Sequence, residues 1–465
     1  MSDAELVALA CCDLGAIVRG RSVPAADLEQ HLALGVGWVP ANHALTPLGP
    51  VAEPNPFGSI GDLRLLPDPR THAVVGAHGE HSAFDVLLCD IVETDGRPWQ
   101  CCPRQFLREA LAELERELGA RVHASFEHEF QIARMSAGAG ARGAAADGRA
   151  AGADGGAAGG GGEWPDPLPF TIEAQRLLEP FPRRAMAALA GAGLEPERFF
   201  AEYAPRQFEL PVAPAEGLAA ADRAVLVREV VREVARREGM RASFAPLGDP
   251  EQAGNGVHVH LSLLDGAGRP LLYDAARPGA LGELGGAFAA GVLAHACALS
   301  AITAPSPVSA ARLRPHRWSA GAACLARQSR EALLRIPPLL ELGGSDAAQQ
   351  LHLEYRGADA AANPHLALGA IVRAGLDGVR RGLPPPPLLE ADPAGLEGEQ
   401  AERFGVGALP GTLEQALQAL ADDGTARSWM SPLLYEAYLS VKRAELDAAA
   451  GVELRELCER YGAIY

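Results

Sequence analysis

One stretch, residues 122–132, constrains the fold more than any other, because its residues alternate between apolar and polar with a period of two. That period is typical of a β-strand with one buried face and one polar face. The buried face would carry Val122, Ala124, Phe126, Phe130 and Ile132, and the polar face His123, Ser125, Glu127, Glu129 and Gln131. Two glutamates then point the same way from a half-buried strand, where they repel each other unless a cation lies between them. For one such strand taken alone, a solvent-exposed polar face is the simpler interpretation.

The same alternation recurs in three further stretches, at residues 207–210, 257–263 and 351–356. If their polar faces converge with the first, they form a pocket rich in carboxylates and imidazoles. Its acidic members would be Glu127, Glu129, Glu202, Glu209 and Glu354, and its histidines His258 and His260. Such a cluster is stable only around cations. Oxygen-rich ligation with a single histidine per site suits Mg²⁺ or Mn²⁺ and not structural zinc.

Arginines gather further along the chain, in a protein whose net charge is −18: Arg312, Arg314, Arg317, Arg327, Arg330 and Arg335. Arginine binds phosphate and carboxylate groups through two parallel hydrogen bonds. Metal ions beside arginines are what phosphoryl transfer requires. Surface ion pairs are the alternative for some of them, Arg314 and Arg317 first. The chain has no GxxxxGK[ST] loop, so a nucleotide would need another architecture.

Composition narrows the class of protein. The acidic net charge argues against a nucleic-acid or membrane-surface partner. None of the eight cysteines forms a CxxC pair, so we expect reduced thiols in a cytoplasmic protein. The first residues lack the basic and apolar run of a signal peptide. The most apolar stretch, 287–304, is rich in alanine and glycine and is expected to be a buried helix.

The order of the segments predicts an α+β chain. Short strands dominate residues 1–102, where we place a small β-rich domain. Residues 103–118 have the spacing of a helix that leads into the alternating strand, and the larger domain is placed at 103–465. Within it, residues 136–162 are almost all glycine, alanine, aspartate and arginine without periodicity, so we expect a disordered insertion there.

Taken in this order, the motifs resemble those of the glutamine synthetase family over nearly the whole chain. The resemblance lies in the N-terminal Cys12-Asp13-Leu14-Gly15 and in the E-x-E strand Glu127-His128-Glu129. It continues in the stretch from Glu202 to Glu209, the G-x-H-x-H-x-S segment from Gly256 to Ser262, and Arg335-Ile336-Pro337. It ends in Glu354-Tyr355-Arg356, followed by Asn363-Pro364.

The resemblance implies a fold and a set of site residues. The fold would be an N-terminal β-grasp domain joined to a large α/β catalytic domain with a curved antiparallel sheet. One metal ion would be held by Glu129, Glu202 and Glu209, and the other by Glu127, His258 and Glu354. The ATP phosphates would face His260, Ser262 and Arg335. The substrate residues would be Arg312, Arg356, Trp318 and Gly256. The transferring phosphoryl group would be stabilised by Arg330, with Arg312 also counted as catalytic.

The resemblance also implies chemistry and partners. A glutamate side chain would attack the γ-phosphate of ATP, and an amine would displace phosphate from the resulting γ-glutamyl phosphate to give an amide. Each site would use two or more Mg²⁺ or Mn²⁺ ions. The partners would be small molecules and further copies of the chain, arranged in a ring that is usually a double hexamer.

Several positions depart from the family pattern and leave three functions open. The family's usual Asn-Ser-Tyr is replaced at 308–310, and Arg206 stands in place of the glycine of its P-G-Q turn. Gln349 and His352 stand where basic residues are expected before the E-x-R strand. Trp318 stands where glutamine-forming members carry an acidic flap residue, which resembles members that use larger amines. The first prediction is therefore a ligase that joins glutamate to an amine other than ammonia. The alternatives are glutamine synthesis itself and an inactive regulatory or assembly protein, although the six filled metal-ligand positions weigh against inactivity.

Overall fold

A six-stranded sheet forms the N-terminal part of the computed structural model, which describes residues 5–134, 168–340 and 342–465. The strand order is β2-β1-β6-β4-β3, with β5 added alongside β6. The strands are β1 (Leu6–Cys12), β2 (Val18–Pro24), β3 (Val36–Trp38), β4 (Leu63–Pro67), β5 (Ala73–Val75) and β6 (Phe84–Glu93). Helix α1 (Leu28–Leu34) precedes β3. The expected insertion at 136–162 lies outside the described residues.

A ten-stranded sheet forms the larger part of the chain, and its longest strand, β7 (Ala120–Arg134), contains the alternating stretch. The order is β16-β13-β14-β15-β12-β7-β9-β8, and β10 and β11 also pair with β7. Most neighbours are antiparallel, but β13 runs parallel to β14 and β16. The other strands are β8 (Phe200–Ala201), β9 (Gln207–Leu210), β10 (Ala215–Glu216), β11 (Met240–Ser243), β12 (Val257–Asp265), β13 (Ala322–Arg327), β14 (Ala332–Ile336), β15 (Leu353–Tyr355) and β16 (Leu388–Leu389).

Helices cover the apolar face of this sheet. Its core includes Phe130 of β7, whose ring contacts the rings of Phe181, Phe199, Phe208 and Phe244. The long helices are α2 (Pro103–Leu118), α4 (Phe181–Gly191), α5 (Gly217–Arg237), α6 (Glu283–Ala294), α7 (Ala296–Thr303), α10 (Pro364–Arg380), α12 (Leu413–Asp422), α14 (Pro432–Ala449) and α15 (Leu454–Gly462). The short ones are α3 (Ile172–Arg176), α8 (Ser309–Arg312), α9 (Ala347–Gln350), α11 (Glu399–Arg403) and α13 (Gly424–Ser428).

The apolar stretch 287–304 lies in helices α6 and α7, most of whose residues are buried inside the protein. Among the described residues, no single helix is long and apolar enough to cross a membrane. By length and composition alone the α6–α7 pair would pass that test, with a bend of 74° between the two helices.

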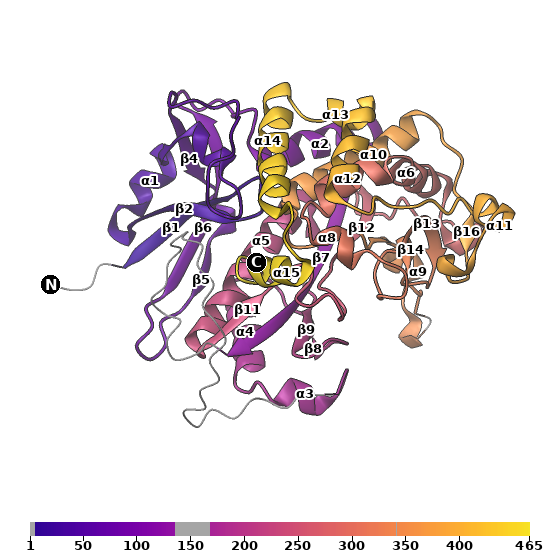
Figure 1. The fold of residues 1–465 in the computed structure, drawn as a ribbon, viewed down its shortest axis with the longest axis horizontal. Coiled ribbons are helices and arrows are strands. Elements are labelled where there is room, and N and C mark those ends of the chain that lie inside the picture. The colour runs from indigo at the N-terminus through magenta and orange to yellow at the C-terminus, as the bar shows by residue number, and fades with distance from the viewer. Residues whose placement is uncertain (1–4, 135–167, 341) are drawn as a thin grey trace.

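A buried ion-pair network joins the N-terminal sheet to helices α2 and α5 of the larger part. The two sheets lie side by side in Figure 1. Arg104, near the start of α2, is 3% exposed. Its guanidinium donates to Asp90 of β6 at 2.6 Å, to Asp68 at 3.0 Å and to Asp222 of α5 at 2.8 Å. Buried charges are tolerated only when they are paired in this way. The network therefore fixes the N-terminal sheet against the helices of the larger part.

The C-terminal helices add a second junction. Lys442 of α14, the one lysine in the chain, is fully buried and donates to Glu445 at 2.7 Å. The hydroxyl of Tyr461 donates to the same carboxylate at 2.9 Å, and the hydroxyl of Tyr465 donates to the carbonyl of Gly15. In Figure 1, α14 runs between the N-terminal sheet and the larger sheet.

Candidate active site

The polar face of the larger sheet opens into a cavity of about 680 Å³. Register explains why the predicted side chains meet there. Across β7 and its neighbours, Glu127 pairs with His258 and Glu129 pairs with Glu209, while His260 of β12 pairs with Glu354 of β15. Because side chains at paired positions share one face of a sheet, the four alternating stretches present one common polar surface. All six predicted metal ligands line the cavity.

Most of the other predicted site residues line the same cavity: His260, Ser262, Arg330, Arg335, Arg356 and Trp318. Arg312 and Gly256 are absent from its lining. The Arg312 side chain is buried behind it, where Nη2 donates to the carbonyls of Gly357 at 3.1 Å and Ala358 at 2.9 Å. A Cβ on Gly256 would lie 2.8 Å from His258 Nε2 and 3.2 Å from Arg312 Nη1. Glycine at position 256 is therefore what lets these two side chains come together.

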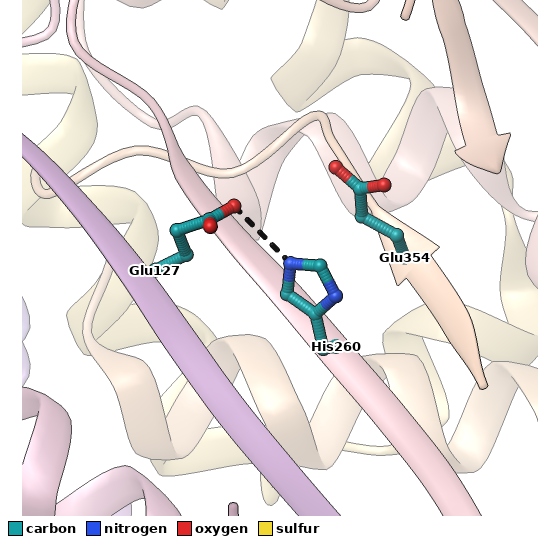
Figure 2. Close-up of side chains that lie close together, drawn as sticks. All are labelled: Glu127, His260 and Glu354. Carbon is teal, nitrogen blue, oxygen red and sulfur yellow. Dashed lines mark hydrogen bonds and ion pairs between the residues drawn. The ribbon is translucent and has the colours of Figure 1, made fainter. Parts of the chain in front are cut away.

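The glutamates of the cavity lie around two histidines, His258 and His260. His258 Nδ1 lies 3.2 Å from Glu127, and its Nε2 lies 3.8 Å from Glu129. His260 Nε2 also lies 3.2 Å from Glu127, and Figure 2 shows His260 between Glu127 and Glu354. Potential ligand atoms of Glu127, His260 and Glu354 all lie within 4.8 Å of one another. The structure thus adds His260 to the candidate ligands beside Glu127 and Glu354, and the choice between His258 and His260 stays a prediction.

Burial and mutual repulsion perturb the acidic side of the cavity. Burial and the neighbouring Glu129 raise the pKa of Glu202 to about 7. Burial, and then the charge of Glu127, raise the pKa of Glu209 well above its usual range. Burial likewise raises the pKa of Glu129, although its carboxylate accepts a hydrogen bond from the Gly256 N–H at 2.8 Å. A divalent cation would relieve this repulsion, and an oxygen-rich donor set fits Mg²⁺ or Mn²⁺.

Glu354 has the opposite environment. Arg335 Nη1 donates to one of its oxygens at 2.7 Å, and Arg356 Nη1 donates to the other. Burial favours the neutral acid, but Arg356 leads the charges that lower the pKa of Glu354 to about 2. The cavity is therefore divided between a side where carboxylates repel one another and a side where arginines gather. Such a division is suited to binding a metal–phosphate complex.

Two aromatic rings lie at the mouth of the cavity. Tyr203, on the turn between β8 and β9, and Trp318, on the loop before β13, are 52% and 56% exposed. Their ring centroids are 6.3 Å apart and their planes differ by 14°. Sequence reasoning found Trp318 but missed Tyr203, because the two residues belong to distant segments and nothing local in the sequence indicates that they meet.

Sequence reasoning also missed the partner of His260. His352 Nε2 lies 3.0 Å from His260 Nδ1, and His352 Nδ1 contacts the carbonyl of Gln350 at 2.6 Å. The sequence pattern put His352 on the polar face with Glu354 and Arg356, and in place of an expected basic residue, but it did not pair His352 with His260. The available signal was its position two residues before Glu354, just ahead of strand β15, which continues the alternation.

Comparison with known proteins places the chain among glutamine synthetases and their relatives. Residues 1–99 match the glutamine synthetase N-terminal domain, and residues 100–458 match the glutamine synthetase catalytic domain. The chain is 36% identical over 448 residues to the gamma-glutamylpolyamine synthetase GlnA3 of Streptomyces coelicolor, covering 96% of this chain and 91% of that protein. It is 30% identical over 386 residues to the glutamine synthetase of Halobacterium salinarum, covering 83% of this chain and 79% of that protein. The crystal structure of a novel glutamine synthase homolog superposes with a TM-score of 0.86 at 44% identity, covering 100% of this chain and 99% of that one.

Fold, site and comparisons together define a carbon–nitrogen ligase that uses ATP with Mg²⁺ or Mn²⁺. The chain belongs to the glutamine synthetase family. The predicted fold class is confirmed: an α+β chain with a small N-terminal domain of this family and a large catalytic domain built on a curved sheet.

Proposed function

We propose that the protein is an ATP-dependent ligase that joins the γ-carboxylate of glutamate to an amine larger than ammonia. The observation that carries the proposal is the stacked pair Tyr203 and Trp318 at the mouth of an acidic cavity. Aromatic faces attract organic cations, and their apolar area packs against an alkyl chain. Ammonia has no carbon chain to use such a surface. The 36% identity to a gamma-glutamylpolyamine synthetase supports the same class of amine.

We assign the residues of the cavity to metal binding and to phosphate binding. Glu129, Glu202 and Glu209 would hold one metal ion, and Glu127 and Glu354 would hold the other together with His258 or His260. When bound, these ions bridge the nucleotide phosphates and offset their charge. His260 and Ser262 line the cavity and would face the ATP phosphates. We also propose that the N-terminal domain ends at residue 102 and that the catalytic domain begins at residue 103.

The arginines would bind the acidic substrate groups. Arg356 spends three of its N–H groups on the protein, donating to Glu354, to the carbonyl of Arg330 at 2.9 Å and to the carbonyl of Trp318 at 3.1 Å. A guanidinium has five N–H donors, so about two are left for a substrate carboxylate. Arg330 and Arg335 line the cavity and would stabilise the phosphoryl group as it moves from ATP to the acid. Arg312 would act from behind the cavity lining.

We further propose that the protein assembles into a ring of identical subunits, as the resemblance implies. Analytical ultracentrifugation of the full chain measures this directly. A hexamer or dodecamer is the expected species, and a monomer at micromolar concentration would contradict the proposal.

Phosphate release from ATP tests the function, with Mg²⁺ or Mn²⁺ and glutamate present. The amines compared are ammonia, monoamines, polyamines and anilines. We expect turnover with a carbon-bearing amine and little with ammonia. The second candidate is glutamine synthesis, which the match to the Halobacterium salinarum glutamine synthetase supports. Turnover with ammonia alone would favour it. The third candidate is an inactive regulatory or assembly protein, which is suggested by Gln349 and His352 in place of the family's basic residues. Absence of turnover with every amine, despite ATP binding, would favour it.

A further inference from the structure

The loop that carries Trp318 is strained. Between α8 and β13, His316 has a φ of 60° and Trp318 a φ of 57°. This left-handed region favours glycine and is costly for a bulky side chain such as tryptophan. Residues stay in such conformations only where surrounding contacts hold them, and these positions cluster at binding sites.

One carboxylate binds both strained residues. Glu331 Oε2 accepts a hydrogen bond from the His316 N–H at 3.0 Å, and Glu331 Oε1 accepts one from the Trp318 N–H at 3.0 Å. Both oxygens of a single side chain are therefore committed to the backbone of the strained loop. Hydrogen bonds to an ionised carboxylate are about twice as strong as those between neutral groups.

The same turn also holds the loop from the cavity side. Glu331 directly follows Arg330 between β13 and β14. Arg356 donates to the carbonyl of Arg330 at 2.9 Å and to the carbonyl of Trp318 at 3.1 Å. The Trp318 N–H therefore donates to Glu331, and the Trp318 C=O accepts from Arg356, which lines the cavity. The ring itself stays 56% exposed and stacks on Tyr203.

We infer that Glu331 is a positioning residue for the amine site: it holds Trp318 in the backbone conformation that keeps its ring against Tyr203 at the cavity mouth. The inference rests on the proposed function, because it assigns the aromatic pair to the amine. Glu331 is absent from the lining of the cavity, so it acts through Trp318 and touches no substrate. It opens instead to a second groove that it shares with Arg327, Glu390 and Asp392.

Hydrogen–deuterium exchange of the full chain tests the structural half without any assay of activity. Mass spectrometry follows the peptide spanning residues 313–320 in the wild type, in Glu331→Ala and in Glu331→Gln. Glu331→Ala should exchange about tenfold faster, because losing a charge-assisted hydrogen bond changes an equilibrium by roughly one order of magnitude or more. Glu331→Gln keeps one acceptor oxygen and should fall between. The matched control is Glu390→Gln, which lines the same groove and pairs with Arg327 at 3.6 Å. Unchanged exchange in Glu331→Ala would overturn the inference.

A double-mutant cycle tests the functional half. Glu331→Ala should raise the KM for the amine about tenfold while leaving the KM for ATP unchanged. In a Trp318→Ala background the same substitution should add nothing, because effects of residues that act through one another do not add. An equal further rise in that background would refute the inference. If the wild type uses no amine, the proposed function fails, and the exchange experiment still decides the role of Glu331.

Discussion

Replacing Glu202 by glutamine should make the metal-free protein more stable and at the same time remove its response to metal. Burial and Glu129 raise the pKa of Glu202 from 4.5 to about 7. An unfolded chain ionises this carboxyl near 4.5, so between those pH values the folded protein binds more protons and loses stability as the pH rises. Above pH 7 the penalty is complete.

The size of the effect follows from the pKa difference. A tenfold change in proton affinity is worth about 1.4 kcal/mol, so the raised pKa of Glu202 corresponds to roughly 3 kcal/mol at pH 8. Because the side chain is partly exposed, solvent screening reduces this to about 2 kcal/mol. Glu202→Gln carries no charge to desolvate and should recover that amount. At pH 5 the gain should shrink to well under half, because the wild-type carboxyl is then largely protonated in the folded state.

Thermal and urea unfolding of chelator-treated protein measure both effects. At pH 8, metal-free Glu202→Gln should unfold at a higher midpoint than the wild type. Added Mn²⁺ should stabilise the wild type strongly and the variant weakly, since a ligand stabilises only the state that binds it. Glu197→Gln is the matched control, because Glu197 lines the same cavity and, within the described part of the chain, its ion-pair partner is Arg198, at 3.8 Å. Equal stability of variant and wild type at pH 8, or an equal gain from Mn²⁺, would refute the assignment of Glu202 to the metal cluster.

Two further predictions concern the Arg104 network, and a third concerns Glu129 of the cavity. Arg104→Met should lower the free energy of unfolding by about 3–5 kcal/mol in urea, because it removes a buried guanidinium and leaves the buried Asp222 without its arginine partner. A loss below 1 kcal/mol would show that the network is not buried in solution. Burial opposes ionisation of Asp222, but hydrogen bonds from His365 and Arg104 lower its pKa from 3.8 to about 2. Stability should therefore fall by about 2 kcal/mol as the pH drops from about 4 to about 2, and acid-titrated circular dichroism should show Arg104→Met unfolding at a higher pH. Glu129→Ala should abolish metal-dependent phosphate release and leave the sedimentation coefficient unchanged; undiminished turnover would contradict its role as a ligand.

The alternating strands could be predicted from sequence because the pattern is local. Each of the four stretches shows its polar face within a few residues, and β7 and β12 follow the expected alternation. His128, between the two glutamates in sequence, lies on the opposite face and is 1% exposed, as that alternation requires. The helix expected at residues 103–118 is α2 with the same bounds.

Features that depend on distant contacts could not be read in the same way. One buried helix was expected at 287–304, but the structure has two helices that meet at a bend of 74° beside His295. His295 contacts Asp377 of α10 and Asp423, which lies between α12 and α13. No proline, the usual sequence signal of a helix bend, lies near His295. The contacts of His260 with His352 and of Tyr203 with Trp318 likewise arise from strand register and loop paths, which the alternation of single strands does not specify.

The buried Lys442 gives the folded protein an unusual chemical property. All other basic side chains are arginine or histidine, so within the described residues no lysine amine meets solvent. Acylating reagents that modify lysine would find this amine only when the helices around Glu445 separate. Mass-spectrometric labelling of Lys442 therefore reports opening of the C-terminal helices as a single-site signal, free of background from surface lysines. Comparing its rate with and without ATP and Mn²⁺ would show whether an occupied cavity tightens a region of the chain that does not line it.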